Sequence, residues 1–485
     1  MKYLWIVLIP VLAWTSCRKD IPVTTDLGAK LSFSEDTMFF DTVFTTLGSS
    51  TRRLKIFNPN NDAIEIAQVR IAGGESSSFR MNFNGNTGDS HENILIESND
   101  SAYLFAEVTI DPNSANTPLI VEDSIIFITN GNRQVIKLVA WGQDAYFYYP
   151  TNALQIGDIT IPYSVVNCNT TWTSDKPHVI YGYLIVDDGC ELAMDPGTNV
   201  HLHDEASIWV VDGGSLKIRG DLGNEVLIQG DRLEPSFEEI PGQWGQIWLS
   251  AGSVDNEIDY AIIKNGTVGV RADTLGHPTN PTLRISNTVI RNMESVGLLG
   301  QGSNIVGENL SITNCGQHCL VLNIGGTYRF EHCTFGNYWS SPTRQTATVL
   351  LNNYYEDIDN NIIPRDLDEA YFGNCIIWGN NNNEVTWDRN NGANFEWLFD
   401  HTIYKVVQAD WPNINFSDPD RFKDSYVNMD PLFTDPLIRG YELDTLSPAQ
   451  DAGDNLIGTN VPFDLLGNSR LSDAAPDLGA YERQD

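Results

Sequence analysis

The sequence predicts an all-β protein with two parts, a β-sandwich followed by a long solenoid of stacked parallel strands. Short runs that alternate apolar and polar residues fill the first part, as in strands with one buried face. The second part repeats one strand-and-turn pattern, mostly at intervals of 22 to 27 residues. No stretch shows the 3.6-residue apolar period of a helix.

The composition excludes some classes of function. The chain of 485 residues has 64 Asp and Glu against 29 Lys and Arg, a formal net charge of −35. Binding to a phosphate backbone needs clustered basic residues, so we expect no nucleic-acid partner. The same charge disfavours docking on anionic lipid by electrostatics alone.

The first residues indicate export. Residues 1–16 begin with a basic pair and an apolar stretch of 12 residues that ends at Trp14, too short to span a bilayer. Small residues directly before Cys17 resemble a bacterial lipoprotein signal. This resemblance implies lipidation of Cys17, a tether over 17–28 and an outer-membrane location, with the cell surface favoured over the periplasmic face. The alternative is an ordinary secretory signal with an incidental cysteine.

Residues 29–146 are predicted to form the sandwich. About seven short strands between turn sequences in a domain of this size are typical of an immunoglobulin-like sandwich. The stretch resembles the Ig-like domains near the N-terminus of Bacteroidetes surface lipoproteins, in segments 40–44, 58–59 and 142–145. Asp followed by Ser or Thr and an aliphatic residue also resembles the O-glycosylation signal of Bacteroidetes. The candidate acceptors are Thr42, Ser101, Ser124 and Thr274.

Residues 147–430 contain the repeats. Equivalent strand–turn units are anchored at 260, 287, 309, 332, 374 and 401, which are 27, 22, 23, 42 and 27 residues apart. A coil of short strands cannot bury its inner side chains alone, so we expect parallel coils to stack. Like residues then lie above one another, which predicts a ladder of Asn287, Asn309 and Asn374. The repeats, with the glycine-rich turns of the opening coils, resemble the right-handed parallel β-helix family.

Six cysteines follow the predicted signal: Cys168, Cys190, Cys315, Cys319, Cys333 and Cys375. An even number in an exported protein permits disulfides. Cys315 and Cys319 flank His318 but lack a second pair at zinc-ligand spacing, which disfavours a metal site. Stacked buried thiols and a disulfide between adjacent coils both remain open.

Residues 431–485 are predicted to cap the last coil, which would otherwise be an open edge. They resemble the C-terminal segment of choice-of-anchor Q β-helix proteins. The residues that carry the resemblance include Ser447-Pro448-Ala449, Asp464, Gly467, Arg470 and Asp477-Leu478-Gly479-Ala480-Tyr481-Glu482.

The sequence gives little support for catalysis. Lyases of the β-helix fold need carboxylates for calcium beside a Lys or Arg base, and hydrolases need paired carboxylates. Asp187-Asp188 is the only Asp-Asp pair in the repeats, and its place before Gly189 predicts a turn. The signatures of polygalacturonase-type hydrolases are absent, and the net charge disfavours a polyuronate substrate.

Two insertions, at 231–244 and 338–366, interrupt the coils, and binding on a solenoid tends to reside in such loops. Aromatic side chains there or in later loops could stack on sugar rings or anchor a protein, or could instead pack the loops onto the barrel. The candidate binding residues are Tyr354, Tyr355, Trp387, Trp397 and Trp411.

Three functional hypotheses follow. The first is a non-catalytic cell-envelope lipoprotein whose β-helix is a platform for a glycan or an outer-membrane protein. The second is a polysaccharide lyase or hydrolase of β-helix fold with an unfamiliar site. The third is an accessory subunit of an outer-membrane complex. We predict no catalytic residue and no cofactor or metal, although the acidic surface suits structural calcium.

Overall fold

The computed structural model describes residues 22–45, 48–49, 51–111, 119–273, 280–340, 342–438, 440–472 and 474–484. Cys17 with the predicted export signal, and Thr274, lie outside these residues. The chain divides into two compact units, Met1–Gln143 and Asp144–Asp485. Within the described residues no helix is long and apolar enough to cross a membrane.

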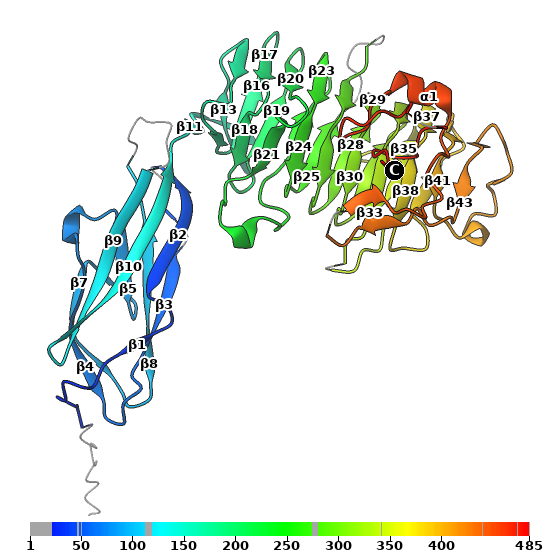
Figure 1. Ribbon diagram of the computed structural model, residues 1–485. Helices are drawn as coiled ribbons and strands as arrows, with labels where there is room; N and C mark the ends of the chain where they lie inside the picture. The colour runs from blue at the N-terminus through cyan, green and yellow to red at the C-terminus, as the bar shows by residue number, and fades with distance from the viewer. Residues whose placement is uncertain are drawn as a thin grey trace, which may run out of the picture. The chain divides into compact units, whose positions relative to one another are not determined.

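The described part of the first unit forms two five-stranded sheets around one apolar core (Figure 1). The pairing between its strands is antiparallel, except that β10 runs parallel to β2. Alternate residues of β8, namely Ala102, Leu104 and Ala106, are buried, as the two-residue period predicted. In spatial order the strands are β1 (Ser32–Phe33), β3 (Arg52–Phe57), β8 (Ser101–Val108), β5 (Phe79–Phe83) and β6 (Asn86–Gly88), then β2 (Thr37–Phe44), β10 (Asn132–Gln143), β9 (Leu119–Thr129), β4 (Ile64–Ile71) and β7 (Ser90–Ile96).

Three of the candidate glycosylation sites lie on strands of this unit. Thr42 is in β2, Ser101 begins β8, and Ser124 is in β9. Each of the three residues is partly exposed. A short 3-10 turn, η1 (Gly74–Ser76), lies between β4 and β5.

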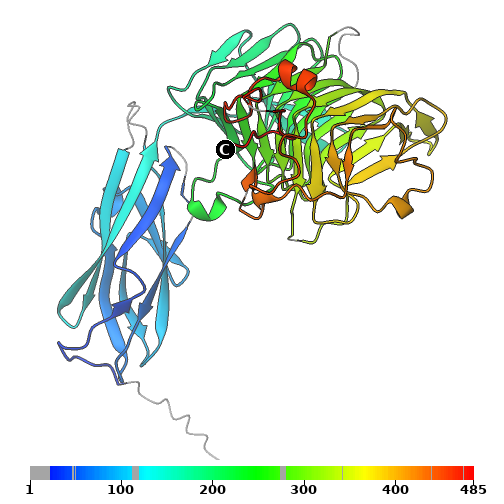
Figure 2. The same cartoon turned by 45° about the vertical axis from the view of Figure 1, so that its right-hand side comes forward.

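The second unit is a three-sided parallel β-helix (Figures 1 and 2). From β13 onward, consecutive strands of the three long sheets belong to different sheets, so each strand pairs with the equivalent strand of the next coil; the first strand, β12, instead pairs antiparallel with β13. Sheet I contains β11 (Tyr146–Tyr148), β15 (His178–Ile180), β18 (Asn199–Leu202), β21 (Val226–Gly230), β24 (Ala261–Lys264), β27 (Val289–Arg291), β30 (Ser311–Thr313), β33 (Thr334–Asn337), β38 (Ile376–Gly379), β41 (Ile403–Tyr404) and β43 (Tyr426–Val427).

The other two sheets have ten strands each in the described residues. Sheet II contains β12 (Asn152–Ile156), β13 (Ile159–Val165), β16 (Tyr183–Val186), β19 (Ser207–Val210), β22 (Ile247–Leu249), β25 (Val268–Ala272), β28 (Val296–Gln301), β31 (His318–Asn323), β34 (Val349–Asn352) and β39 (Val385–Asp388). Sheet III contains β14 (Thr170–Trp172), β17 (Glu191–Met194), β20 (Ser215–Arg219), β23 (Asn256–Asp259), β26 (Leu283–Ser286), β29 (Asn304–Glu308), β32 (Gly326–Glu331), β37 (Leu367–Gly373), β40 (Leu398–Asp400) and β42 (Phe422–Lys423).

The predicted repeat anchors are the corner residues between sheet III and sheet I. All six have a left-handed backbone, a conformation that Asn tolerates better than most residues. Their φ angles are 46° at Tyr260, 46° at Asn287, 57° at Asn309, 51° at His332, 50° at Asn374 and 49° at His401. Asn309 Nδ2 donates to Asn287 Oδ1 at 2.8 Å, and His332 Nε2 lies 3.0 Å from Asn374 Nδ2. The predicted register is therefore confirmed, and the predicted hydrogen bonding along it joins Asn287 to Asn309, while Asn374 bonds to His332 and Asn309 Oδ1 accepts from Arg470.

The structure contains both a disulfide between adjacent coils and buried free thiols, the two states that the sequence left open. Cys168 and Cys190 form a disulfide between the first two coils, 22 residues apart. The remaining cysteines of the β-helix are buried free thiols, and burial raises the pKa of Cys319 and Cys333. Among the described residues, no group of three or more His, Cys, Asp or Glu side chains could hold a metal ion.

The C-terminal residues lie along the outside of sheet I, which corrects the prediction that they cap the last coil (Figure 2). Ala480 N donates to Thr334 Oγ1 at 2.9 Å, and Arg470 Nη2 donates to Asn309 Oδ1 at 2.9 Å. The segment fits there because the outward residues Thr334 and Gly336 of β33 are small, and it packs against the outward side chains of Ile376, Trp378 and Ile403. A Cβ on Gly336 would lie 2.3 Å from the Tyr441 ring. Its elements are β44 (Phe433–Asp435), β45 (Gly440–Leu443) and α1 (Asn455–Asn460).

The residues of the C-terminal sequence motif hold this segment together. Arg470 and Glu482 have fully buried side chains and pair at 3.2 Å. The carboxylate of Asp464 accepts hydrogen bonds from the backbone N–H groups of Asn468 and Glu482. A buried charge is stable only when it is paired or hydrogen-bonded, so the motif has a structural explanation.

Candidate functional site

The outer faces of the three sheets differ in their chemistry. The C-terminal segment covers part of sheet I. On sheet II, the rings of Trp209 and Trp248 stack at 4.7 Å, and the Arg271 guanidinium lies 4.8 Å over Trp248. Trp248 is thus covered by neighbours on both adjacent strands, and this stack offers it no free ring face for a ligand. Charged side chains suited to chemistry gather on sheet III.

Four carboxylates occupy one outward register of sheet III, directly before the corner residues. We call this register the carboxylate stripe. Neighbouring strands in a sheet are about 4.8 Å apart, so paired residues of adjacent coils lie side by side. In coil order the register reads Asp259, Ser286, Glu308, Glu331, Gly373 and Asp400.

Glu308 and Glu331 are the only members of the stripe, among the described residues, that are carboxylates on adjacent strands. Burial raises the pKa of Glu308, and the neighbouring charge of Glu331 raises it further. Glu331 is 3% exposed and accepts a 2.6 Å hydrogen bond from Arg329 Nη2. The pair therefore combines one carboxyl whose pKa is raised with one that has a cationic partner, as in acid–nucleophile pairs.

The surroundings of the pair fix its geometry. The Arg329 guanidinium lies 3.9 Å over the Tyr371 ring, and its Nη1 is 3.5 Å from Glu369 Oε1. Asn460, in α1 of the C-terminal segment, donates to Glu331 Oε2 at 3.5 Å. The last helix thus borders the pair and partly shields it from water.

The far end of the stripe holds Asp400. Its Oδ2 accepts from Lys423 Nζ at 2.9 Å, and its Oδ1 lies 2.7 Å from His401 Nδ1. Hydrogen bonding to Asp400 raises the pKa of Lys423. The neighbouring register position is Gly373, and the absence of a side chain leaves room for the Tyr371 hydroxyl. A Cβ on Gly373 would lie 2.6 Å from that hydroxyl. Asp400 is therefore fully engaged in local contacts and separated from Glu331 by one strand.

The five aromatic candidates lie elsewhere. Trp387 and Trp397 are 5% and 6% exposed and pack with Trp411 inside the last coils, with Trp387–Trp411 centroids 5.2 Å apart. The rings of Trp387 and Trp397 therefore cannot present a face to a sugar, whereas Trp411 is partly buried against the same core. Tyr354 and Tyr355 lie on the hairpin β35 (Tyr354–Glu356) and β36 (Ile362–Pro364).

The two tyrosines make local contacts. Tyr354 Oη donates to the carboxylate of Asp388 at 3.0 Å, which ties the hairpin to sheet II. The Arg365 guanidinium lies 5.6 Å from the Tyr355 ring. The structure thus brings the three tryptophans together but does not bring the tyrosines to them.

Glu308 and Glu331 are absent from the sequence-based candidates, although a signal for them exists. Each stands one residue before a repeat anchor, at 309 and 332. The residue before each anchor shares one strand register, so an alignment extended by one position places the two carboxylates side by side.

The sequence matches no family model and no curated protein. Among solved structures, a family 123 glycoside hydrolase from Clostridium perfringens, whose study concerns glycolipid glycan hydrolysis, is 11% identical with a TM-score of 0.16. The match covers 22% of this chain and 23% of that one, less than a quarter of its length. The catalytic domain of a family 87 α-1,3-glucanase variant is 11% identical in complexes with nigerose and with tetrasaccharides.

Those two matches have TM-scores of 0.17 and 0.16, covering 74% and 72% of this chain and 81% and 80% of the other. All three structures are glycoside hydrolases, so the hypothesis of a non-catalytic platform is not carried further, and the hydrolase alternative is taken up below as a proposal. Likeness at such TM-scores carries no argument for the activity of this chain.

Proposed function

We propose that this protein hydrolyses a glycan, with Glu308 and Glu331 as its two catalytic carboxylates. The observation that carries the proposal is their pairing on adjacent strands in contrasting environments. Hydrolysis of a glycosidic bond needs a protonated carboxyl beside an ionised one, and pairs whose pKa values are pushed apart mark such sites. Perturbed carboxyls in structural ion pairs are the competing explanation.

In this mechanism, Glu308 donates its proton to the glycosidic oxygen while that bond breaks. The Glu331 carboxylate attacks the anomeric carbon from the opposite face and forms a glycosyl ester. Glu308, now ionised, takes a proton from water, which cleaves the ester and restores both side chains. Strands about 4.8 Å apart bring the carboxyls near the roughly 5–5.5 Å spacing of enzymes that retain anomeric configuration.

The substrate that suits this face is a neutral glycan. The net charge of −35 repels polyuronates, and the stripe itself adds carboxylates. The guanidinium groups of Arg284 and Arg329 flank the pair in the neighbouring outward register, where the Arg329 guanidinium covers the buried Tyr371 ring. Guanidinium groups can donate hydrogen bonds to sugar hydroxyls.

Several expectations from the sequence remain proposals beside this one. They are the lipidation of Cys17, the location at the outer-membrane surface, the immunoglobulin-like class of the first unit, the right-handed winding of the β-helix, and the kinship with choice-of-anchor Q proteins. A lipid anchor would hold such an enzyme where extracellular glycans arrive. Metabolic labelling with a clickable fatty acid, in the wild type and in Cys17→Ala, tests the anchor.

The test of the activity is release of reducing ends from a panel of neutral glycans by the full chain. Glu308→Gln and Glu331→Gln should each lower the rate at least about a hundredfold, because each removes one half of the pair. Glu257→Gln is the matched control, since Glu257 lies on sheet III but two coils away from Glu308. Turnover that survives both substitutions, or no turnover on any neutral glycan, overturns the proposal.

A further inference from the structure

A pocket on the opposite edge of sheet I lies between segments that are far apart in the sequence. Its volume is about 340 Å³, which is within the range of small-ligand sites. The two insertions that interrupt the coils meet here with the C-terminal segment, which contributes Pro436 and Leu437. The polar and aromatic lining residues are Glu239, Asn292, Asn314, Tyr338, Trp339 and Ser340.

The first wall of the pocket is the insertion that contains η2 (Pro235–Phe237). Asn292 Nδ2 donates to the Glu239 carbonyl at 3.1 Å, and Arg291 Nη1 lies 3.3 Å from the Glu239 carboxylate. The carboxylate of Glu239 is thus held at the pocket by a cation two coils further along the β-helix. Asn292 sits at a corner with a left-handed backbone, φ 57°.

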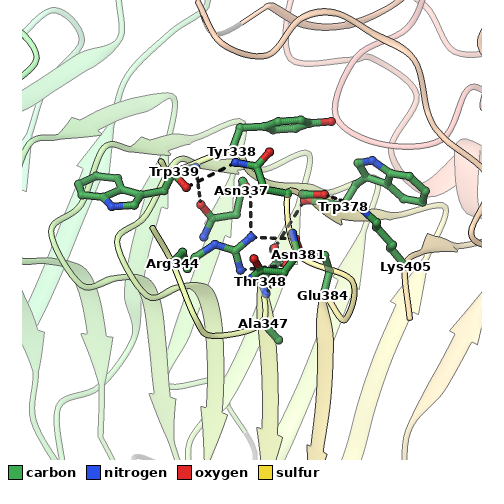
Figure 3. Close-up of polar contacts among 12 residues, drawn as sticks. Asn337, Tyr338, Trp339, Arg344, Ala347, Thr348, Trp378, Asn381, Glu384 and Lys405 are labelled. Carbon is green, nitrogen blue, oxygen red and sulfur yellow. Dashed lines mark hydrogen bonds and ion pairs between the residues drawn. The ribbon is translucent and has the colours of Figure 1, made fainter. Parts of the chain in front are cut away.

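A buried ion pair anchors the second wall (Figure 3). Arg344 Nη2 lies 2.7 Å from Glu384 Oε1, and both side chains are almost completely buried. Arg344 also donates to the carbonyl of Asn337 at 2.9 Å, directly before the pocket residues Tyr338 and Trp339. The insertion is therefore fixed at its base, so its two aromatic residues are preorganised.

Further hydrogen bonds fix the backbone of the two aromatics. Tyr338 N donates to Asn314 Oδ1 at 3.2 Å, and Trp339 N donates to Asn337 Oδ1 at 3.3 Å. The Tyr441 hydroxyl also donates to Asn314 Oδ1, which links the C-terminal segment to the pocket. In the described part of the chain, these bonds leave Asn314 Nδ2 as a donor and Asn292 Oδ1 as an acceptor without protein partners.

We propose that this pocket is a second glycan-binding site, which holds one or two rings of a neutral oligosaccharide outside the catalytic face. A Trp and a Tyr ring match the C–H face of a hexose, while an amide donor, an amide acceptor and a carboxylate match its hydroxyls. The Glu239 carboxylate disfavours an anionic sugar. The site would retain a polymer while the carboxylate stripe, on the other edge of sheet I, acts on it.

Isothermal titration calorimetry with neutral tetrasaccharides of α-1,3-glucose, β-1,4-glucose and β-1,4-mannose tests the site, with tetragalacturonate as the charged comparison. The full chain carrying Glu308→Gln prevents turnover and leaves the pocket intact. Trp339→Ala should raise the Kd of the best neutral ligand at least about tenfold, because the ring is lost while the backbone bonds remain. Ser340→Trp should also weaken binding by filling the pocket.

Tyr355→Ala is the matched control, because Tyr355 lies on a different hairpin of the same unit. It should bind as tightly as the parent. The proposal is overturned if no neutral tetrasaccharide binds, if tetragalacturonate binds best, or if Trp339→Ala and Ser340→Trp bind as tightly as the parent. If binding depends on Trp339 but the chain with Glu308 intact cleaves no neutral glycan, the pocket is supported and only the proposed activity is refuted.

Discussion

Replacement of Arg344 by Met tests whether the buried ion pair holds the second insertion in place. Arg344 and Glu384 are 1% and 0% exposed and lie 2.7 Å apart. The substitution removes hydrogen bonds to Asn337 and Thr346 and leaves the Glu384 carboxylate buried without its cation. Breaking a buried pair in this way costs about 3–5 kcal/mol. Opening of this region should therefore become at least about a hundredfold easier.

The measurement is hydrogen exchange of the peptides that contain 338–352, followed by mass spectrometry. Arg344→Met with Glu384→Gln should lose only about 1–3 kcal/mol, because no buried charge remains and the amide oxygen can still accept from the N–H and the hydroxyl of Thr348. Arg365→Met, on an exposed hairpin, is the control and should stay within about 0.5 kcal/mol of the wild type. Unchanged exchange in Arg344→Met would refute the argument.

Three further predictions concern other parts of the β-helix. Gly336→Val should displace the C-terminal segment at a cost of about 1–3 kcal/mol, because the valine Cβ would lie 2.3 Å from the Tyr441 ring. Limited proteolysis should then cut this segment faster than in the wild type, and an unchanged rate would contradict its placement on sheet I. Burial raises the pKa of Glu308, so wild-type stability is full below the ordinary Glu pKa of about 4.3 and declines as pH rises through the raised value. Glu308→Gln should therefore be more stable than the wild type at pH 7 but not at pH 4 in urea denaturation, and an equal gain at both pH values would be inconsistent with the shift. Cys168→Ser removes a disulfide to Cys190 across 22 residues and should cost about 3 kcal/mol; no change in local exchange of the first two coils would contradict this.

The repeat architecture was predictable because it depends on local chemistry. Each anchor needs a residue that accepts a left-handed backbone, and Asn at 287, 309 and 374 provides it. Stacking of coils then follows from the spacing. The same logic anticipated buried thiols and a disulfide between adjacent coils, although it could not say that Cys168 pairs with Cys190.

The position of the C-terminal segment was not predictable, because it depends on contacts between distant residues. Thr334 and Gly336 are unremarkable in the sequence, yet their small size makes space for Tyr441 and Ala480 on the outside of sheet I. The tryptophans failed as site candidates for a similar reason. Trp387 follows a loop, but its strand turns the ring into the core of the last coils.

The candidate site was predictable only in part. Glu308 and Glu331 each precede a predicted anchor, so their register could be read from the repeats. The contrasting environments of the two carboxylates could not be predicted from the repeats. They depend on Arg329 and on Asn460, which lies in the C-terminal segment, 129 residues after Glu331 in the sequence. The pocket could not be predicted either, because its two insertions are far apart in the sequence and come together only when the coils stack.

The central claim is that Glu308 and Glu331 cleave a neutral glycan as a pair. Proton NMR during digestion of a neutral oligosaccharide tests it most directly, because the spectrum reports the rate of cleavage and the configuration of each new reducing end. The wild type should first release ends with the configuration of the bond that was cleaved, and Glu308→Gln should release them at least about a hundredfold more slowly. Cleavage by Glu308→Gln at the wild-type rate, or no cleavage by the wild type, would contradict the claim.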